Sequence, residues 1–531
     1  MMIRRISVWS ALFSAGLLTL VTVGCGSGSS GTSNPESSIS ATQNPLVAQY
    51  NLALPIPSKN LGAWVEFGTD TTYGRQTSTT AATTSLGPQT IAILVAGMKA
   101  STTYHMRAHV EWYGGGSWVD QDQTFTTGAL PTKALAVTSG AGPLIVPIVA
   151  VTRPGSKFEP SGGVELIDIT PQGPPTHLLD TFVTDLEGNV IWYYDVGAGK
   201  SAFPIRPISN GHFILGIASG LDSLVIREID LAGSTVREVN VAQINQSLQN
   251  NGYTFSLTAF HHDVIVLPNG HWIAIAQTVQ SFTDLPGYPG TTNVSGDVVI
   301  DIDLNGNVAW AWSAFDHLDV NRHLFGLPDW THSNALVYTR NDGNLLLSMR
   351  NQSWILKIEY ENGSGSGNVL WRLGNAGDFT LSGNDPGQWF YAQHFPSPVN
   401  INGSQMTVAV FDDGNLRVLN ENGVICGTPG YDSCVSRATI YQLDESTKTA
   451  SLDWQFFNSL FTPWGGSINQ LANGNVEFDM PQPFLPEDPT ASLIQEVTQT
   501  TNPTLVWQMT VTGGNAYRAY RIPSLYPGVA W

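Results

Sequence analysis

Charged side chains are scarce in this chain: Asp, Glu, Lys and Arg together make up 12% of its 531 residues. The charges are also unbalanced, with 42 acidic against 23 basic residues and a formal net charge of −19 at neutral pH. Nucleic acid binds proteins through Lys and Arg side chains that release its counterions, so this balance argues against a nucleic-acid partner. It equally disfavours a peripheral role on anionic lipid.

Cysteine is nearly absent as well, with three residues in the whole sequence. Cys426 and Cys434 enclose the short loop GTPGYDS, and this spacing predicts a disulfide in an oxidising compartment. A metal pair or a catalytic thiol is the less favoured interpretation, because no neighbouring His or Cys completes a site.

Long apolar runs are missing except for one, at the N-terminus. There Arg4 and Arg5 precede an apolar run over about 8–23, which is the order of an export signal. We therefore expect a signal peptide over 1–25, with an uncleaved membrane anchor as the alternative.

The end of this signal resembles the cleavage site of bacterial lipoproteins. It reads Thr-Val-Gly-Cys, with Thr22 where that pattern usually has Leu. We expect Cys25 to be lipidated, and the protein to be exported and either periplasmic or anchored to a membrane by its N-terminal lipid. Residues 26–44 are rich in Ser, Gly and Thr and predict a flexible tether.

Glycine and proline, by contrast, are abundant, with 53 and 31 residues. Together with many aromatic residues and few charges, they favour an all-β protein with many tight turns. Within residues 45–130, the run TTYHMRAHVEW alternates apolar and polar side chains, as a strand with one buried face does. This segment resembles a fibronectin type III β-sandwich through the runs VEFGTD and QTFTTG.

From about residue 140 onward, two short patterns repeat in alternation. One joins a turn to an apolar strand and occurs five times: SNGHFILGI, PNGHWIAIA, NDGNLLLSM, INGSQMTVAVF and ANGNVEFDM. The other is a strand that usually carries a tryptophan and occurs six times: NVIWYYD, STVREVN, NVAWAWS, NVLWRLG, ASLDWQF and TLVWQMT. Asn-Gly and Asp-Gly provide the positive φ that a two-residue hairpin needs, so each turn joins two adjacent antiparallel strands.

A repeat of this kind predicts a radial array of sheets. A single four-stranded sheet cannot bury both of its faces, so the sheets stack around an axis and cover one another. Six strand patterns predict six sheets, and the missing sixth turn is explained if one sheet combines strands from both ends of the region. The predicted fold is all-β, with a six-bladed β-propeller over 140–531 preceded by a small fibronectin type III-like β-sandwich over 45–130.

Three histidines occupy one recurring position in these units. His262, His332 and His394 lie seven, ten and eight residues before the turns that begin at 269, 342 and 402. The same position in each blade meets at one end of the central channel, so the three imidazoles should share a pocket. The hairpin that begins at His332 ends at Arg350, which places the guanidinium at the same rim.

A single histidine at a strand end is more often structural, but three at one repeat position beside an arginine favour a functional site. Zinc is the competing explanation, since catalytic zinc sites often have three histidines. A fixed cation beside a metal is costly, so Arg350 argues for a tetrahedral oxyanion and against a metal. His261 precedes His262, and strand alternation lets only one of the two face the channel; we favour His262.

The same residues resemble the bacterial arylsulfotransferases, which move a sulfuryl group from one phenolic ester to another phenol without a nucleotide donor. The similarity lies in HHD and LPNG within 261–270, DWTHSN at 329–334, SMRNQ at 348–352, QH at 393–394 and FDDG at 411–414. These pieces follow the family's order, and the resemblance spans about 140–531.

The resemblance implies that His394 takes the sulfuryl group and that His262, His332, Asn334 and Arg350 line the site, with no cofactor. A neutral imidazole would attack sulfur, while the arginine and the other histidines stabilise charge on the sulfuryl oxygens and the departing phenolate. His262 or His332 would then serve as the base for the acceptor. The expected partners are an aryl sulfate donor and a phenolic acceptor, with a lipid anchor and a homodimer as further associations.

Two residues depart from the family's pattern. Phe395 stands where Asp is frequent, and Asp413 replaces the more usual Asn. These changes alter the acceptor or mark a relative without transferase activity. Two other functions therefore stay open: a sulfate-ester hydrolase that uses the same pocket, and a propeller that binds ligands without turnover.

Four further residues are candidates by position alone. Trp330, Phe390 and Trp464 flank the predicted site and are suited to hold an aryl ring, although packing in the core is an equal alternative. Asp329 is adjacent to the site in sequence and is a candidate for orienting a neighbouring side chain.

Overall fold

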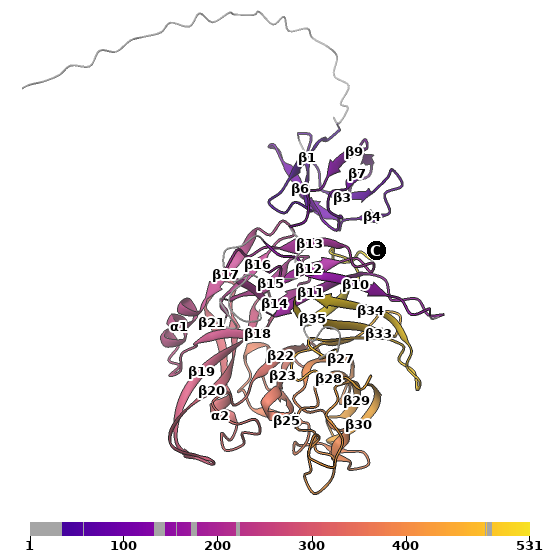
Figure 1. Ribbon diagram of the computed structural model, residues 1–531. Helices are drawn as coiled ribbons and strands as arrows, with labels where there is room; N and C mark the ends of the chain where they lie inside the picture. Colours follow the sequence, from indigo (N-terminus) through magenta and orange to yellow (C-terminus); the bar gives the residue numbers. More distant parts are fainter. Residues whose placement is uncertain are drawn as a thin grey trace, which may run out of the picture.

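The computed structural model describes residues 34–56, 58–131, 144–155, 157–170, 178–218, 223–483, 485 and 491–531 (Figure 1). Within these residues the protein is mostly β, and its strands form seven sheets. The predicted signal over 1–25 and the predicted lipidation at Cys25 lie outside the described residues.

The N-terminal strands form two sheets that enclose a shared apolar core. The first contains β1 (Glu36–Ala41), β2 (Ala48–Ala53) and β6 (Thr90–Val95). The second contains β3 (Leu61–Gly68), β4 (Arg75–Gln76), β5 (Thr80–Ala82), β7 (Thr103–Trp112), β8 (Ser117–Val119) and β9 (Gln123–Thr126). Side chains of β7 alternate between buried and more exposed positions, which confirms the predicted strand with one buried face.

The predicted flexible tether over 26–44 differs from the structure in its second half. Glu36–Ala41 is β1, and it pairs antiparallel with β2 along its whole length. Most of its side chains are exposed, so the Ser-rich composition is compatible with an edge strand that backbone hydrogen bonds hold in place.

The remaining strands form five sheets, which include six antiparallel groups of four. In chain order these are β11 (Val164–Thr170), β12 (Thr181–Thr184) and β13 (Val190–Tyr194) with β35 (Asn515–Ile522); β14 (Ser201–Pro207), β15 (Phe213–Ala218), β16 (Ser223–Ile229) and β17 (Thr235–Asn240); β18 (Ala259–Val266), β19 (Trp272–Leu285), β20 (Tyr288–Ile302) and β21 (Val308–Ser313); β22 (Ser333–Thr339), β23 (Asn344–Met349), β24 (Trp354–Ile358) and β25 (Val369–Leu373); β27 (His394–Asn402), β28 (Gln405–Asp412), β29 (Arg437–Asp444) and β30 (Thr449–Phe456); and β31 (Ile468–Gln470), β32 (Val476–Met480), β33 (Ser492–Val497) and β34 (Leu505–Thr512). β10 (Ile148–Thr152) adds to β34, and the short β26 (Thr380–Leu381) adds to β30. A bridge between Ser223 and Phe260 joins two of these groups into one sheet.

All the strands predicted from the two repeat patterns are strands in the structure. The turns between them use glycine where φ is positive, as at Gly270 (84°) and Gly343 (70°). β35 pairs with β11, so one group combines strands from distant parts of the sequence, as the missing sixth turn predicted.

One strand from each group is here called an inner strand: β14, β18, β22, β27, β31 and β35. Side-chain contacts join each inner strand, or the residues just before it, to the next: Arg206 with Asp263, Asp263 with Leu336, Asn334 with Gln393, His394 with Gly465, Ser467 with Ala519, and Tyr517 with Phe203. The inner strands therefore form a closed ring.

Tryptophans of the repeat fill the space around these sheets. Five of these tryptophans are almost fully buried: Trp192, Trp272, Trp312, Trp371 and Trp507. Burial of large apolar side chains on both faces of each sheet is what holds such a ring together.

Helices are few and short: α1 (Val241–Asn250), α2 (Ala314–His317), and the 3₁₀ turns η1 (Arg350–Gln352), η2 (Glu361–Gly363) and η3 (Pro386–Gln388). Asn240 caps α1, because its side-chain oxygen accepts a hydrogen bond from the backbone N–H of Gln243. Of the helices in the described ranges, none has the length and apolarity needed to span a bilayer.

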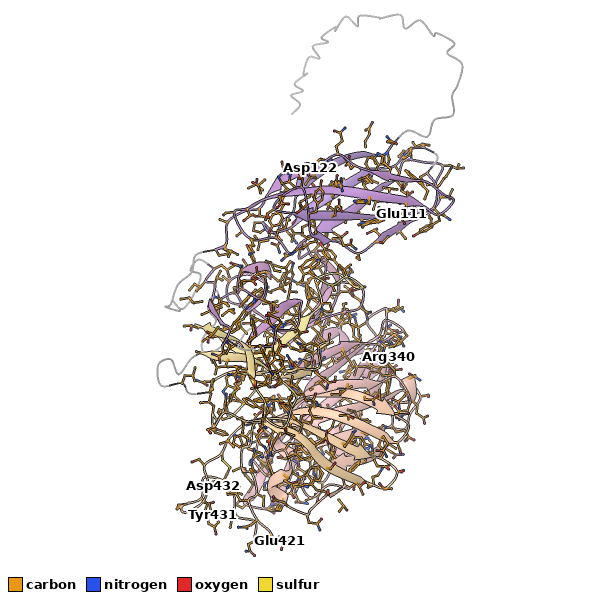
Figure 2. All side chains as sticks on the ribbon, turned by 90° about the vertical axis from the view of Figure 1, so that its right-hand side faces the viewer. Glu111, Asp122, Arg340, Glu421, Tyr431 and Asp432 are labelled. Carbon is orange, nitrogen blue, oxygen red and sulfur yellow. A yellow bond between two sulfur atoms is a disulfide. The ribbon has the colours of Figure 1, made fainter. Side chains whose placement is uncertain are left out.

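The C-terminal residues join the larger part of the molecule to the N-terminal sheets. The Trp531 ring lies 5.9 Å from the Phe67 ring, and the Arg75 guanidinium lies 4.8 Å from the centre of the Trp531 ring. The Tyr526 hydroxyl accepts from the backbone N–H of Ala96 and donates to the carbonyl of Leu94. Figure 2 shows the N-terminal sheets, marked by Glu111 and Asp122, at one end of the molecule.

Candidate active site

The starts of the inner strands meet at one end of the ring. The residues that gather there are Phe203, His262, His332, His394, Gly465 and Tyr517. The rings of His262 and His332 are 4.7 Å apart, and the Tyr517 ring lies 5.8 Å from those of both His262 and His394. The structure thus brings the three predicted histidines to one place.

The backbone around these histidines is strained. φ is 57° at His262, 48° at His332, 52° at Ala392 and 47° at Phe395, all in the left-handed region that favours glycine. Each such residue costs on the order of 1–3 kcal/mol, and strain of this kind gathers at functional sites. The strained backbone orients these side chains toward one end of the ring.

His261 and His262 point in different directions. Nε2 of His261 lies 3.2 Å from a carboxylate oxygen of Asp297, while the ring of His262 faces His332. The two histidines share a hydrogen bond between their Nδ1 atoms, 2.8 Å apart. Burial, followed by the neighbouring His332 and His261, holds the pKa of His262 well below its usual range, so its ring is neutral near pH 7.

His332 lies at the exposed side of the cluster. Its Nδ1 is 2.5 Å from a carboxylate oxygen of Asp329, and the two side chains are 29% and 51% exposed. The backbone N–H of Arg350 donates to the carbonyl of His332 at 3.1 Å, which is the proximity that the hairpin predicted. Asp329 therefore does orient a neighbour, as its position suggested.

The guanidinium of Arg350 spans two parts of the site. Nη2 donates to the carbonyl of Pro463 at 2.8 Å, Nη1 donates to the side chain of Asn351, and the Phe325 ring lies 5.0 Å away. The remaining donor, Nε, is buried without a partner among the described residues. An arginine donor left free beside several histidines is suited to an oxyanion ligand.

His394 is the most enclosed of the three histidines, at 2% exposure. Its Nδ1 lies 3.1 Å from Oδ1 of Asp413, and its Nε2 accepts a hydrogen bond from the backbone N–H of Gly465 at 3.2 Å. Burial and the positive charge of Arg350 hold the pKa of His394 well below its usual range. The ring is therefore a neutral base with its lone pair on Nε2.

Asn334 holds the backbone of Gln393, the residue just before His394. Its side-chain amide donates to the carbonyl of Gln393 at 2.7 Å, and its Oδ1 is buried with no partner in the described part of the chain. The family resemblance implied a substrate contact for Asn334, whereas the structure places its amide on the backbone next to His394.

Three charged residues, here called the Asp263 cluster, lie further along the inner strands. Arg206 donates to both oxygens of Asp263, each at 2.6 Å, and Arg518 donates to Oδ1 at 3.1 Å. Both guanidinium groups lie over the ring of Phe395, at 5.1 Å and 4.9 Å. Phe395 thus packs against this cluster, which accounts for an aromatic residue at that position.

Sequence patterns did not identify Tyr517, Phe203 and Gly465. All three sit at inner-strand starts that lack histidine, so the repeat-position argument would have found them only if every unit had been aligned. Tyr517 contacts two of the histidines, and its buried hydroxyl has no partner among the described residues.

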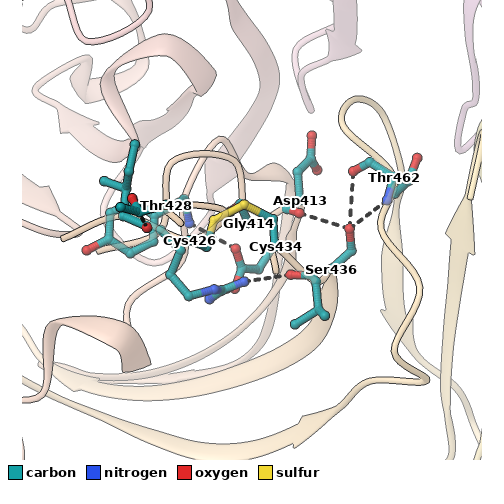
Figure 3. Close-up of a disulfide and its surroundings, with 12 residues drawn as sticks. Asp413, Gly414, Cys426, Thr428, Cys434, Ser436 and Thr462 are labelled. Carbon is teal, nitrogen blue, oxygen red and sulfur yellow. Dashed lines mark hydrogen bonds and ion pairs between the residues drawn. A yellow bond between two sulfur atoms is a disulfide. The ribbon is translucent and has the colours of Figure 1, made fainter. Parts of the chain in front are cut away.

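The predicted disulfide between Cys426 and Cys434 is confirmed, and it lies close to the site (Figure 3). Cys426 Sγ contacts the carbonyl of Gly414, the residue after Asp413. Beyond the loop, Ser436 donates through its hydroxyl to the carbonyl of Asp413 and accepts from the N–H of Thr462. Ser436, two residues after the disulfide, therefore links the segment of Asp413 to the segment that leads to Gly465.

Of the aromatic candidates, two belong to the core. Trp330 stacks on Phe315 at 5.0 Å, and both it and Phe390 are buried in apolar clusters. Trp464 is half-buried and lies between the residues that bond Arg350 and His394. It remains the aromatic candidate beside the site.

Metal ligation was the competing explanation for three histidines. Across the part of the chain that the structure describes, no group of three His, Cys, Asp or Glu side chains is arranged to hold a metal ion.

Solved structures resemble this chain only weakly. A member of the DUF4221 family from Bacteroides vulgatus is 8% identical, with 71% of this chain and 97% of that chain covered and a TM-score of 0.27. A mutant of the apocarotenoid oxygenase of Synechocystis is 12% identical, with 92% and 95% covered and a TM-score of 0.29. At these TM-scores the similarity carries no conclusion about fold or chemistry.

No curated protein sequence matches the chain. The family model described as Arylsulfotransferase (ASST) matches residues 176–521, which include every inner strand except the end of β35. By this match the chain belongs to the arylsulfotransferase family.

Proposed function

We propose that the protein transfers a sulfuryl group from a phenolic sulfate ester to an acceptor phenol in two steps, through an N-sulfated His394. Membership of the family implies arylsulfotransferase activity. The observation that supports this mechanism is the buried, neutral imidazole of His394, whose Nε2 accepts a hydrogen bond from the N–H of Gly465 and whose pKa nearby Arg350 and His332 help to lower.

In the first step, Nε2 of His394 attacks sulfur. The N–S bond forms, and the bond from sulfur to the aryl oxygen breaks with its electron pair leaving on the phenolate. The low pKa of His394 keeps the lone pair unprotonated near pH 7. The N–H of Gly465, which holds Nε2 at rest, is then free to donate to a sulfuryl oxygen.

Arg350 stabilises the charge that develops during transfer. Its Nε has no partner among the described residues, so it can bind a sulfuryl oxygen without losing another hydrogen bond. Sulfuryl transfer resembles phosphoryl transfer in its need for positioning and charge stabilisation, and a fixed guanidinium supplies both. The neutral ring of His262 completes this wall of the site.

In the second step, the acceptor phenol attacks the sulfur of sulfated His394. His332 takes the phenol proton, because it is the exposed histidine and its Nδ1 is held by Asp329. The N–S bond breaks and its electron pair returns to Nε2 of His394. His332 then releases the proton to solvent, where the donor phenolate is protonated, and the resting protein is restored. Asn334 keeps the backbone at Gln393 in place throughout.

The same evidence supports the finer description of the fold. We propose that residues 140–531 form a six-bladed β-propeller whose inner strands line the central channel, and that residues 45–130 form a fibronectin type III-like β-sandwich. Six groups of four antiparallel strands and a closed ring of inner strands support the first proposal. Two sheets around one apolar core support the second.

We also propose that the protein is exported, with Cys25 as the point of lipid attachment. The disulfide between Cys426 and Cys434 supports an oxidising compartment. Mass spectrometry of the N-terminal peptide from the native host tests this: a diacylated Cys25 agrees with the proposal, and an intact Met1 contradicts it.

The decisive experiment mixes the purified protein with an aryl sulfate that releases a coloured phenol, with and without a second phenol. We expect colour release that depends on the second phenol, together with a sulfuryl-sized mass increase that is absent in His394→Ala. Colour release without an acceptor would instead indicate a hydrolase. Neither colour nor adduct across several aryl sulfates would contradict an enzyme of this class and leave a binding function.

A further inference from the structure

We propose that Asp413 is a positioning residue for this reaction. It fixes His394 in the tautomer that carries its proton on Nδ1, and in its ionised form it stabilises the positively charged ring of sulfated His394. The second part rests on the proposed function, because it needs the sulfated intermediate.

The tautomer follows from two hydrogen bonds. A backbone N–H can only donate, so the bond from Gly465 to Nε2 requires a lone pair on that atom. The proton of the neutral ring is therefore on Nδ1, which donates to Oδ1 of Asp413 at 3.1 Å. Removing the acceptor on Asp413 removes the reason for the ring to prefer this tautomer.

Asp413 is held rigidly but is not saturated with partners. Its side chain is fully buried, its backbone carbonyl accepts from Ser436, and its second carboxylate oxygen has no partner among the described residues. The contrast with its neighbour is sharp, since Asp412 accepts from both Arg417 and Arg437. A carboxyl group with one histidine partner and one free oxygen can change its charge during a reaction.

The charged groups that face Asp413 come from several elements. Arg350 follows β23, Asp412 precedes Asp413 at the end of β28, Asp479 lies on β32, and His394 begins β27. Burial raises the pKa of Asp413 well above its usual range; Arg350 opposes this shift, and the two carboxylates reinforce it. The ionised form is consequently gained only as pH rises above the ordinary range for a carboxyl group.

The ionised form matters after the N–S bond has formed. The ring then keeps its Nδ1 proton and carries a positive charge, so the hydrogen bond to a carboxylate becomes an ion pair in a buried setting. No proton needs to move in this step. An asparagine, which the family usually has here, would accept the same hydrogen bond but would supply no negative charge.

The test compares the wild type with Asp413→Asn, which preserves the shape and the acceptor. We expect the rate of adduct formation on His394, followed by intact mass in a single turnover, to fall about 10-fold or more in the variant. We also expect the acid limb of the pH profile for adduct formation to move or disappear. Equal rates and equal pH profiles in the two proteins would overturn the charge part of the proposal.

Asp329→Asn is the matched control, since it removes a carboxylate from the other histidine of the site. It should leave the protonation pattern of the His394 ring unchanged. That pattern is read from ¹⁵N resonances of histidine-labelled protein, with His394→Gln identifying the signal. In wild type, in Asp413→Asn and in Asp329→Asn we expect the proton on Nδ1.

Asp413→Leu removes the acceptor, and here we expect the Nε2–H tautomer to become populated. A ring that keeps its proton on Nδ1 in a folded Asp413→Leu protein, with folding judged by its melting temperature, would overturn the tautomer part. The NMR measurement needs no substrate. A wild type that forms no adduct therefore refutes the proposed function while the tautomer is still decided.

Discussion

Two buried aspartates near the three histidines, Asp413 after β28 and Asp263 within β18, behave in opposite ways. Burial by itself raises the pKa of both. At Asp263 the guanidinium groups of Arg206 and Arg518 overcome this effect and lower the pKa, whereas at Asp413 the pKa stays well above the usual range. The protein therefore fixes one charge and leaves the other adjustable.

The difference lies in the partners. Both oxygens of Asp263 are used by donors, including the backbone N–H of Leu336, while Asp413 has a single histidine partner and a free oxygen. A buried carboxylate between two arginines is a structural element that resists change. A buried carboxyl group beside one neutral imidazole responds to the chemistry of that imidazole.

The largest effect on activity is expected from replacing His394, the partner of Asp413. His394→Ala should abolish the adduct and lower turnover by about 10⁴-fold or more, because no other group takes the sulfuryl group. The melting temperature should change little. Steady-state assays and intact mass check this, with His212→Ala, a variant of the half-buried histidine that pairs with Glu228, as the control. Retained adduct in His394→Ala would assign the nucleophile elsewhere.

Breaking the Asp263 side should affect folding instead. Asp263→Asn leaves the buried Arg518 and the half-buried Arg206 without their counter-charge, and we expect a loss of about 3–5 kcal/mol in the free energy of unfolding. Denaturant unfolding measures the loss, and Asp432→Asn on the exposed disulfide loop provides the same exchange without a buried partner (Figure 2). Unchanged stability would mean that Asp263 carries no structural charge.

Arg350 extends the comparison to arginine. Unlike Arg206 and Arg518, which hold Asp263, it has a free Nε donor that we assign to the sulfuryl group. Arg350→Lys keeps the charge but loses the guanidinium fork, and kcat should fall about 100-fold, or roughly 2.7 kcal/mol of transition-state stabilisation. The exposed Arg340→Lys is the control. If only the first step becomes slower, the adduct on His394 forms more slowly while its transfer to the acceptor phenol keeps the same rate. No change in either step would remove Arg350 from the oxyanion role.

The smallest effect concerns a third aspartate, Asp168, which lies near the Asp263 cluster. Burial raises the pKa of Asp168 to about 8, so the folded protein keeps a proton that the unfolded chain releases above the ordinary aspartate pKa of 3.8. Stability is therefore lost as pH rises from about 4 to 8. Asp168→Asn removes this loss, and its melting temperature relative to wild type should rise with pH by roughly 3 °C or more at pH 8. A difference that does not depend on pH would contradict the raised pKa.

Much of the site followed from spacing in the sequence. The positions of His262, His332 and His394 before their turns brought them together, and the hairpin placed Arg350 beside His332. Spacing works here because each unit repeats the same hairpin, so equal positions of different units lie close together. The same logic explains why β35 could be expected to pair with β11.

The site residues that the sequence did not reveal are placed by contacts between separate strands and units. Gly465 contributes a backbone N–H, which has no signature in residue type, and Tyr517 lies in a unit without histidine. Asp413 was seen only as a departure from a family pattern, because its distance to His394 depends on how β27 and β28 pair. The strand at Glu36–Ala41 was missed for a similar reason, since its partner β2 decides its conformation more than its own residues do.

The pairing of β35 with β11 also sets the order in which the chain can fold. β35 follows every other strand in sequence, yet Tyr517 and Arg518 on it contact the histidines and the Asp263 cluster. The ring cannot close during synthesis until this strand has left the ribosome, and pairing between distant strands is slow. For the export proposed above, this arrangement would keep the chain open for longer, because the strand that closes the ring is synthesised last.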